Sequence, residues 1–587
     1  MKAEAKPLNF ITVEGLIKVP FFQRPYVWDE ENWEKLFEDL ADNRNYHFLG
    51  SIIFKQQNVS TGGTKEVLLI DGQQRLATIC ILLKAIYDNL EDDKKKNLYS
   101  TLEPYIYYKK NPTDSKLEEK IKLSKNDRED YKEIILNGNI SDSTKESKLI
   151  RCYNYFHKKL KDDINEGGAD SLDKLIEKIF SPIYKLFVII DLEADDNEQE
   201  IFDTINSTGV RLSSADIIKN ALFQKVLELN VSETELTDLY KKYWEDIFQS
   251  DKEKEDEWLK EKNTGRVKRD NIEILFHSYA VIKKFFDPEN DNLSDLSSIY
   301  KKKLHEFKTI AEIEKFLMEL TKYADIFYNN LISEIDLLKF DDQIHRTLHI
   351  INTLGLSTFY PLILFILQDT KLAKDREKYL QALEKYVIRR AIANKTTKNY
   401  NKEIKNFIKD INSLISASND DTDDTEISGG LQNISNNKAN LILFWIELYR
   451  RKDPKYDIKE LKYTYTLEHI LPTKWEEYWS DVNVYGENGN EITNGEEKKS
   501  VRNQFLKSIG NMTLLTSNLN SSLRNNNFER KINGFDGKKG IKDYADLSIT
   551  QEILPSYPSI NSWDERNITK RTQSLFGEVK NIWSTGL

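Results

Sequence analysis

Residues 270 to 415 constrain the fold more than any other stretch of the chain. Apolar residues recur there at helical spacing and turn signals are few, so the stretch is predicted to form an α-helical bundle. The 587-residue chain is several times longer than a usual domain of about 100–150 residues, so other folding units must flank this bundle.

The N-terminal flank has the patterns of a mixed α/β domain. A helix is predicted to begin near Asp29, and β-branched and aromatic residues predict strands over 47–54, 67–70 and 187–190. The second of these strands leads directly into a polar turn at 71–75 and then into a helix. The local architecture is therefore strand, tight turn and helix.

A stretch rich in Asp, Asn, Ser and Gly separates the bundle from the C-terminal flank and predicts a flexible loop or linker over 416–437. The expected organisation is then an N-terminal domain over 1–250, a helical region over 251–415, the linker, and a C-terminal domain over 438–587. The expected fold class is α+β, with a mostly helical C-terminal domain.

Composition argues against several classes of protein. The longest apolar run, Phe359–Leu367, is far shorter than the roughly 20 residues of a membrane helix, and no export signal is recognised. The two cysteines, Cys80 and Cys152, cannot build a disulfide framework or a Cys-rich zinc site. We therefore expect a cytoplasmic protein with no membrane partner, in which any metal ion has oxygen and nitrogen ligands.

The charge is unevenly distributed along the chain. The net charge of −11 argues against nucleic-acid binding over the entire surface. The segment from Lys498 to Lys542, together with Asp543, instead holds ten basic and three acidic residues. This reversal of sign predicts a local surface that faces DNA.

A Glu-His pair stands in the C-terminal domain. Glu468 and His469 lie in a predicted strand that Pro472 ends, and a second strand-like run begins near Asn511, nine residues before Asn520. On a regular strand the two adjacent side chains point to opposite faces. The combination of a carboxylate, an imidazole and two amides resembles the HNH, or ββα-metal, nucleases.

The HNH resemblance implies a role for each of these residues. His469 would be the general base that activates water, and Asn511 would pin the loop between the strands. Glu468 and Asn520 would be ligands of Mg²⁺ or Mn²⁺. The chain departs from the common pattern at Leu523, where a lysine is usual, and in the long polar segment between the two strands.

A second group of polar residues lies in the N-terminal domain. The turn after the second predicted strand offers a glycine, the backbone N–H groups of a helix N-terminus and an arginine, which together can hold a phosphate. A rigid segment containing proline and a third polar turn add further polar side chains. The candidate nucleotide ligands are Gln23, Arg24, Asp71, Gly72, Gln73, Gln74, Arg75 and Asn206.

Several motifs resemble GmrSD-type, modification-dependent restriction enzymes. The ParB-like N-terminal module of these enzymes is similar to Phe-Gln-Arg-Pro-Tyr-x-Trp, Ile-Asp-Gly-Gln-Gln-Arg-Leu and Phe-x-x-x-Asn-x-x-Gly-x-x-Leu. Their HNH-like half is similar to Glu-His-Ile-Leu-Pro and Gly-Asn-Met-Thr-Leu-Leu. The resemblance covers nearly the whole chain.

This family resemblance implies a function in antiviral defence. The N-terminal half would bind and hydrolyse a nucleoside triphosphate of unknown identity, without a P-loop, and the C-terminal half would cut double-stranded DNA. The substrate would carry a modification such as glucosylated hydroxymethylcytosine or a phosphorothioate linkage.

Other functions stay open at this point. The chain could be a ParB-like nucleotide switch that binds DNA through a non-cleaving HNH module. It could also be a toxin-like effector that cuts RNA, because HNH chemistry requires only a phosphodiester. A homo-oligomer is a further expectation, since one nuclease site per chain needs two copies or two nicks to break a duplex.

Overall fold

The computed structural model describes residues 2–20, 22–41, 48–56, 66–90, 92–110, 116–125, 127–138, 147–167, 169–192, 213–229, 231–264, 267–333, 335–486, 488–556 and 563–584. The chain divides into two compact units, Met1–Ser232 and Glu233–Leu587. None of the helices in the described ranges is both long enough and apolar enough to cross a membrane. Helices and sheet strands occur together, so the α+β class is confirmed.

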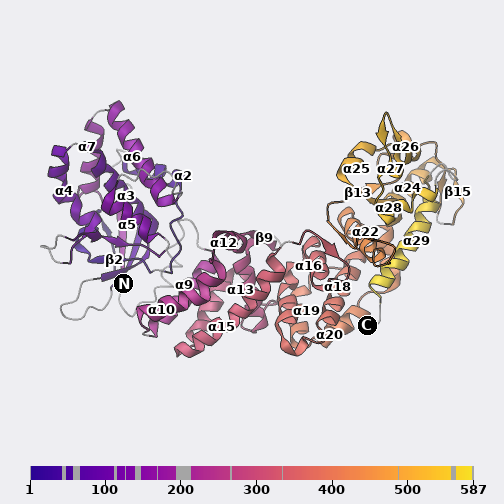
Figure 1. Cartoon of the computed structure of the whole chain (residues 1–587), viewed down its shortest axis with the longest axis horizontal. Helices are drawn as coiled ribbons and strands as arrows, with labels where there is room; N and C mark the ends of the chain where they lie inside the picture. The colour runs from indigo at the N-terminus through magenta and orange to yellow at the C-terminus, as the bar shows by residue number, and fades with distance from the viewer. Residues whose placement is uncertain are drawn as a thin grey trace. The chain divides into compact units, whose positions relative to one another are not determined.

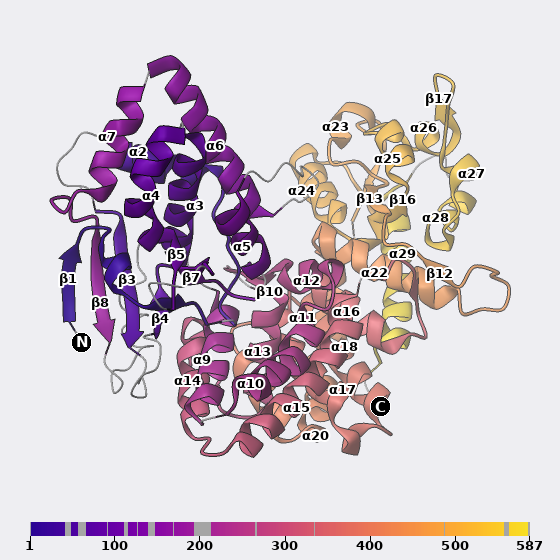
Figure 2. The ribbon, with the colours of Figure 1, turned by 60° about the vertical axis from the view of Figure 1, so that its left-hand side comes forward.

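A six-stranded mixed sheet forms the centre of the first unit, in the order β1-β8-β3-β4-β2-β7. β3 pairs parallel with β8 and antiparallel with β4, and β4 pairs parallel with β2. Figure 2 shows β1, β8 and β3 side by side. The strands are β1 (Lys2–Lys6), β2 (Leu16–Lys18), β3 (Gly50–Gln56), β4 (Glu66–Asp71), β7 (Ile121–Lys122) and β8 (Phe187–Leu192).

The helices of the first unit pack on this sheet and on each other. Most residues of α3 are buried, because this helix packs against α4, α5 and α6 and its apolar side chains belong to the core of the unit. The predicted strands and the helix after Asp29 are all present, within a few residues of the expected ends. The helices are α1 (Phe10–Val13), α2 (Glu30–Ala41), α3 (Gln73–Asn89), α4 (Asp92–Ile106), α5 (Arg128–Asn137), α6 (Lys148–Gly167), α7 (Ala169–Phe180) and α9 (Ser214–Glu228).

Helices also build most of the second unit, as the helical spacing over 270–415 predicts (Figure 1). The division between the units falls before the expected boundary at residue 250, because Trp244 and Phe248 pack against the rings of Phe276 and Trp258. The main helices are α10 (Glu233–Tyr240), α13 (Asn271–Ile282), α15 (Ile310–Phe327), α16 (Gln343–Thr353), α17 (Tyr360–Gln368), α18 (Arg376–Ile392), α19 (Tyr400–Lys409), α22 (Asn436–Arg450) and α29 (Glu565–Ile582).

The prediction of a flexible loop or linker over 416–437 is wrong. Two helices, α20 (Asn412–Asp420) and α21 (Asp424–Gln432), occupy most of that stretch. Asp423 and Glu426 form a reciprocal capping box at the start of α21. Asp424 pairs with Arg389 of α18 at 3.1 Å. A Cβ on Gly430 would stand 2.1 Å from a backbone oxygen of α18, so this glycine permits close helix packing. The acidic and small residues thus serve helix capping and packing.

The C-terminal residues share this unit with the helical region. Trp583 donates its Nε1 proton to Glu384 of α18 at 2.8 Å, and its carbonyl accepts from Arg389 at 3.2 Å. Buried polar contacts of this kind fix the end of α29 on α18. No flexible segment separates residues 438–587 from the helices before them within the described ranges.

Candidate functional site

Two of the three polar segments predicted for the N-terminal site lie side by side. Gln23 donates from Nε2 to the backbone oxygens of Leu69 and Ile70 in β4, both at 3.3 Å. Gln73, the first residue of α3, donates from Nε2 to the backbone oxygen of Arg24 at 3.1 Å. These contacts fix the arginine-bearing segment along the turn between β4 and α3.

Gln74 strengthens the same arrangement from inside the unit. Its Oε1 accepts from the backbone N–H of Val27 at 2.8 Å, and its Nε2 donates to the backbone oxygen of Pro25 at 3.3 Å. The side chain is 8% exposed. Both ends of the Gln74 amide therefore bond to the protein, and its role in the site is to position the neighbouring segment.

The turn itself requires glycine. Gly72 precedes α3 with φ of +97°, in the left-handed region, and a Cβ there would stand 3.0 Å from Ile52 Cγ1. The backbone N–H groups at the start of α3 lie directly after this turn. A helix N-terminus of this kind favours a negatively charged ligand.

Charged side chains line the turn. Arg75 donates from Nη1 to the backbone oxygen of Ser51 at 3.1 Å and lies 3.9 Å from Asp71 Oδ2. Burial raises the pKa of Asp71, and Arg75 and Arg24 oppose that rise. Burial lowers the pKa of Arg24, opposed by Asp216 and Asp71. Two guanidinium groups thus act on one half-buried carboxylate.

Gly50 contributes to this site, although nothing in its sequence context marks it. A Cβ at Gly50 would stand 2.7 Å from Arg75 Nε, so the guanidinium lies against the backbone of β3. Asn206, the remaining predicted nucleotide ligand, lies outside the described residues. Ser213, just after that undescribed stretch, caps α9 by accepting from the backbone N–H of Asp216 at 3.1 Å.

The second group of predicted residues lies on two antiparallel strands followed by a helix. β13 (Thr466–His469) pairs with β16 (Met512–Leu515), and α25 (Ser517–Leu523) comes next. The register is regular, with Glu468 opposite Thr513 and His469 opposite Met512. The Glu468 and His469 side chains consequently make contacts with different parts of the unit.

His469 contacts α24 (Gly495–Leu506) and α22. Its Nδ1 lies 3.2 Å from the backbone oxygen of Leu506, and its Nε2 lies 3.3 Å from Asn436 Oδ1. Nδ1–H donates to the Leu506 carbonyl, because that oxygen can only accept. In the neutral ring Nε2 then presents a lone pair, for which Asn436 must turn its amide nitrogen, and not its oxygen, toward the ring. Burial lowers the pKa of His469 and so favours that neutral form.

Glu468 forms a buried ion pair that the sequence pattern did not reveal. Lys531, in α26 (Phe528–Asn533), donates to Glu468 Oε1 at 2.5 Å and to the backbone oxygen of His469 at 2.6 Å. Burial raises the pKa of Glu468 and lowers that of Lys531, and the ion pair opposes both shifts. The available signal was that Lys531 shares a helix face with Phe528 and Ile532.

The two asparagines bond to β13 and to the residues that follow it. Asn511 is fully buried, accepts from the backbone N–H of Leu471 at 2.8 Å and donates to the backbone oxygen of that residue at 3.0 Å. Asn520, in α25, donates to Thr466 Oγ1 and to the backbone oxygen of Leu467, both at 2.9 Å. Asn520 thereby reaches the strand that carries Glu468.

The predicted basic surface is smaller than the residue count suggests. Arg502 and Lys531 are fully buried, the first in an ion pair with Glu565 at 2.9 Å, so neither can contact a ligand from the surface. Lys498 is half-buried. The exposed members are Lys499, Lys507, Arg524, Arg530, Lys538, Lys539 and Lys542.

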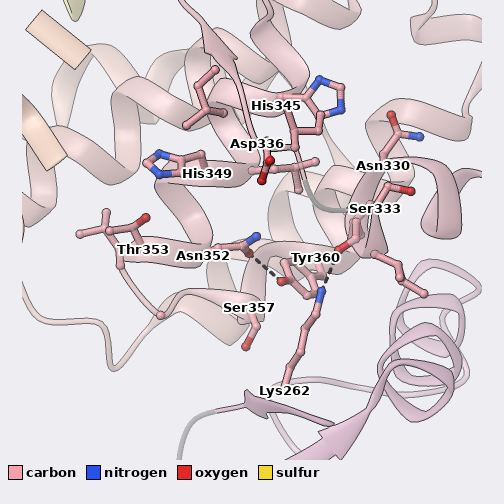
Figure 3. Close-up of a pocket in the computed structure, with 17 residues that line it drawn as sticks. Lys262, Asn330, Ser333, Asp336, His345, His349, Asn352, Thr353, Ser357 and Tyr360 are labelled. Atoms are coloured by element: carbon pink, nitrogen blue, oxygen red, sulfur yellow. Dashed lines mark hydrogen bonds between the residues drawn. The ribbon is translucent and has the colours of Figure 1, made fainter. Parts of the chain in front are cut away.

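A separate cavity of about 720 Å³ lies among the helices of the second unit, where α16 and α17 contribute to its wall (Figure 3). Tyr360 donates to Asn352 Oδ1 at 2.6 Å, and Lys262 donates to the backbone oxygen of Leu331 at 2.8 Å. None of the predicted site residues within the described ranges lines this cavity. The cavity is therefore distinct from both candidate sites.

Comparison with known proteins matches both halves of the chain to one family. Residues 7–223 match the GmrSD restriction endonuclease N-terminal domain, and residues 384–578 match the GmrSD restriction endonuclease C-terminal domain. The chain belongs to the GmrSD restriction endonuclease family. The first match contains the Gln23–Arg75 site, and the second contains Glu468, His469, Asn511 and Asn520.

One curated relative is "Uncharacterized protein MJ0686" of Methanocaldococcus jannaschii, which is 26% identical over 253 residues. The matched region is 37% of this chain and 40% of that protein. The chain thus spans less than half the length of this relative.

Proposed function

We propose that the protein is a nucleotide-regulated, divalent-metal-dependent endonuclease that cuts modified phage or foreign DNA in antiviral defence. The observation that carries the proposal is the antiparallel pair of β13 and β16 followed by α25. A carboxylate and a neutral imidazole occupy consecutive positions of β13, and two amides bond to the backbone of the same segment. Membership of the GmrSD restriction endonuclease family supports DNA as the substrate. The nuclease is of the HNH type.

The nuclease residues fit a cation held by oxygen. Among the described residues, no group of three or more His, Cys, Asp or Glu side chains is arranged for a metal ion. Lys531 bonds one oxygen of Glu468, and Asn520 bonds β13 through its side-chain nitrogen. The other carboxylate oxygen of Glu468 and the amide oxygen of Asn520 are therefore the atoms that would act as ligands. Bound Mg²⁺ or Mn²⁺ would supply charge stabilisation at the scissile phosphate.

His469 is the general base in this mechanism. The Leu506 carbonyl holds the proton on Nδ1, and the Nε2 lone pair accepts a proton from the attacking water once the Asn436 amide has moved away from it. Asn511 bonds both backbone groups of Leu471 and keeps the chain after β13 in one conformation. Asn520 positions α25 against the strand that carries Glu468.

The DNA-facing surface surrounds α26. The hairpin of β17 (Gly534–Phe535) and β18 (Lys538–Lys539) follows this helix directly. The cationic groups of Arg530 and Lys538 lie over the ring of Phe535, 5.7 Å and 5.5 Å from its centroid. Cations stacked on a half-buried aromatic ring suit phosphate contacts along a duplex. Such contacts position DNA without reading a modification.

The N-terminal site is proposed to bind and hydrolyse a nucleoside triphosphate. Arg75 and Arg24 contact phosphate oxygens together with the N-terminus of α3, and Asp71 orients an attacking water. Gln23, Gln73 and Gln74 hold the two segments together through backbone contacts. Nucleotide occupancy regulates cleavage at the second site, and discrimination of modified DNA resides in the N-terminal half.

Parallel cleavage assays test this function. Plasmid DNA, phage DNA with glucosylated hydroxymethylcytosine, phosphorothioate DNA and tRNA are incubated with the full chain, a nucleoside triphosphate and Mg²⁺, Mn²⁺ or EDTA. The proposal expects cleavage of a modified duplex, with no activity in EDTA. Preferential cleavage of tRNA would favour an RNA-cleaving effector, and DNA binding without cleavage would favour a nucleotide switch.

A further inference from the structure

We propose that Lys531 is a positioning residue of the nuclease site, which holds Glu468 and the backbone of His469 together and weakens cation binding until DNA arrives. This inference rests on the proposed nuclease function.

The ammonium of Lys531 joins two consecutive residues of β13. It donates to Glu468 Oε1 at 2.5 Å and to the backbone oxygen of His469 at 2.6 Å. The Lys531 side chain is 1% exposed and that of Glu468 is 10% exposed. This contact therefore fixes the Glu468 carboxylate relative to the backbone of the residue that bears the base.

The position of Lys531 is set by the core and by the cap of its own helix. Asn527 Oδ1 accepts from the backbone N–H of Arg530 at 3.0 Å and so caps α26. Phe528 and Ile532 flank Lys531 on the same helix face and are each 2% exposed in the C-terminal core. A side chain anchored in this way can orient Glu468 without first being ordered by a ligand.

The charge of Lys531 also affects the cation site. The ammonium already neutralises Glu468, so a divalent cation at the other carboxylate oxygen would lie close to a fixed positive charge in a poorly hydrated place. Binding of the cation alone is therefore weak. The phosphate of a bound DNA brings the negative charge that offsets this repulsion, and cation and DNA then bind together.

Two variants of the full chain test this proposal. Lys531→Met keeps the length of the side chain and removes its charge, and Lys570→Met is the matched control because Lys570 is exposed on α29. Mn²⁺ binding to the DNA-free protein is measured by electron paramagnetic resonance, and kcat and KM are measured on cleavable DNA. Circular dichroism checks the fold of each variant.

Lys531→Met should bind Mn²⁺ about tenfold more tightly than the wild type, since a repelling charge is gone. Its kcat should fall about 100-fold while KM for DNA changes little, because the carboxylate loses its fixed position relative to β13. Lys570→Met should match the wild type in all three values. Unchanged Mn²⁺ affinity together with unchanged kcat in Lys531→Met would overturn the proposal.

A second measurement decides the matter if Lys531→Met does not fold. Mn²⁺ is titrated into His469→Ala, which leaves DNA intact, with and without a duplex. An affinity that rises at least about tenfold with DNA supports the proposal, and equal affinities overturn it. If the wild type cleaves no nucleic acid, the nuclease function fails, whereas the Mn²⁺ titration of Lys531→Met still tests the role of the lysine.

Discussion

The two candidate sites differ in how far their ion pairs are buried and in how close the paired charges lie. In the N-terminal site, the Arg75 and Asp71 side chains are 15% and 20% exposed and lie 3.9 Å apart. In the nuclease site, Lys531 and Glu468 are 1% and 10% exposed and lie 2.5 Å apart. The first site presents charge to an incoming anion, whereas the second has neutralised its own carboxylate and needs a ligand that brings charge with it.

Loss of the general base should produce the largest effect. We expect His469→Ala to reduce the cleavage rate by about 10²–10⁴-fold while DNA binding persists, because phosphate contacts do not depend on the imidazole. Single-turnover cleavage and a filter-binding assay measure the two quantities. His305→Ala, an exposed histidine on α14 (Leu296–His305), is the control. Cleavage at the wild-type rate by His469→Ala would remove this residue from the mechanism.

Substitution in the N-terminal site should affect nucleotide binding. Arg75→Ala removes a charge-assisted contact worth roughly 1.5–3 kcal/mol, so nucleotide affinity should fall about 10–150-fold. Isothermal titration calorimetry measures this affinity, with the exposed Arg151 of α6 replaced by Ala as the control. Equal affinity in Arg75→Ala and the control would leave Arg75 with a structural role, through its contacts with the Ser51 carbonyl and Asp71.

Asp127 links the stability of the N-terminal site to pH. It accepts from the backbone N–H of Tyr26 at 2.7 Å, and burial raises its pKa to about 6. Because the folded pKa exceeds the ordinary value of 3.8, this group stabilises the fold below about pH 4 and loses that contribution as pH rises through about 6. Asp127→Asn should therefore gain up to about 2–3 kcal/mol at pH 7.5 and nothing near pH 4.

Denaturant unfolding at the two pH values measures this difference. The exposed Asp162 of α6, replaced by Asn, is the control and should show no such dependence. A gain for Asp127→Asn that is equal at both pH values would show that burial of its charge is not the cause.

The smallest effect is expected at the basic surface. Lys538→Met should weaken binding of modified and unmodified duplexes equally, by a few-fold, and reduce the slope of log K against log salt by about 1. Fluorescence anisotropy across a salt series measures both values, with Lys570→Met as the control. A weakening confined to modified DNA would assign modification sensing to the C-terminal half.

Local patterns predicted much of this fold because they reflect local physics. The sequence predicts the strand, the polar turn and the helix that the structure places over 66–89. Burial depends on how the whole unit packs, so the sequence did not reveal that Arg502 and Lys531 are buried and do not belong to the basic surface. The helices within 416–437 were missed because capping residues and linker residues are of the same types.

The contacts between distant segments were equally hidden. Nothing near Gly50 indicates that Arg75 lies against it, and nothing near Asn436 indicates that it faces His469 across 33 positions of chain. Both contacts depend on which elements meet in the folded unit. The identities of the candidate residues were accessible from motifs, whereas their partners required the structure.

We infer that this one chain carries two chemically separate centres, one for nucleotide hydrolysis and one for DNA cleavage. The most direct test measures nucleoside triphosphate hydrolysis and DNA cleavage in the same preparations of the wild type and His469→Ala. We expect His469→Ala to hydrolyse nucleotide at the wild-type rate and to cut modified DNA at least about 10²-fold more slowly than the wild type. A folded His469→Ala protein that loses both activities, or that cuts DNA at the wild-type rate, would show that the two centres are not separate.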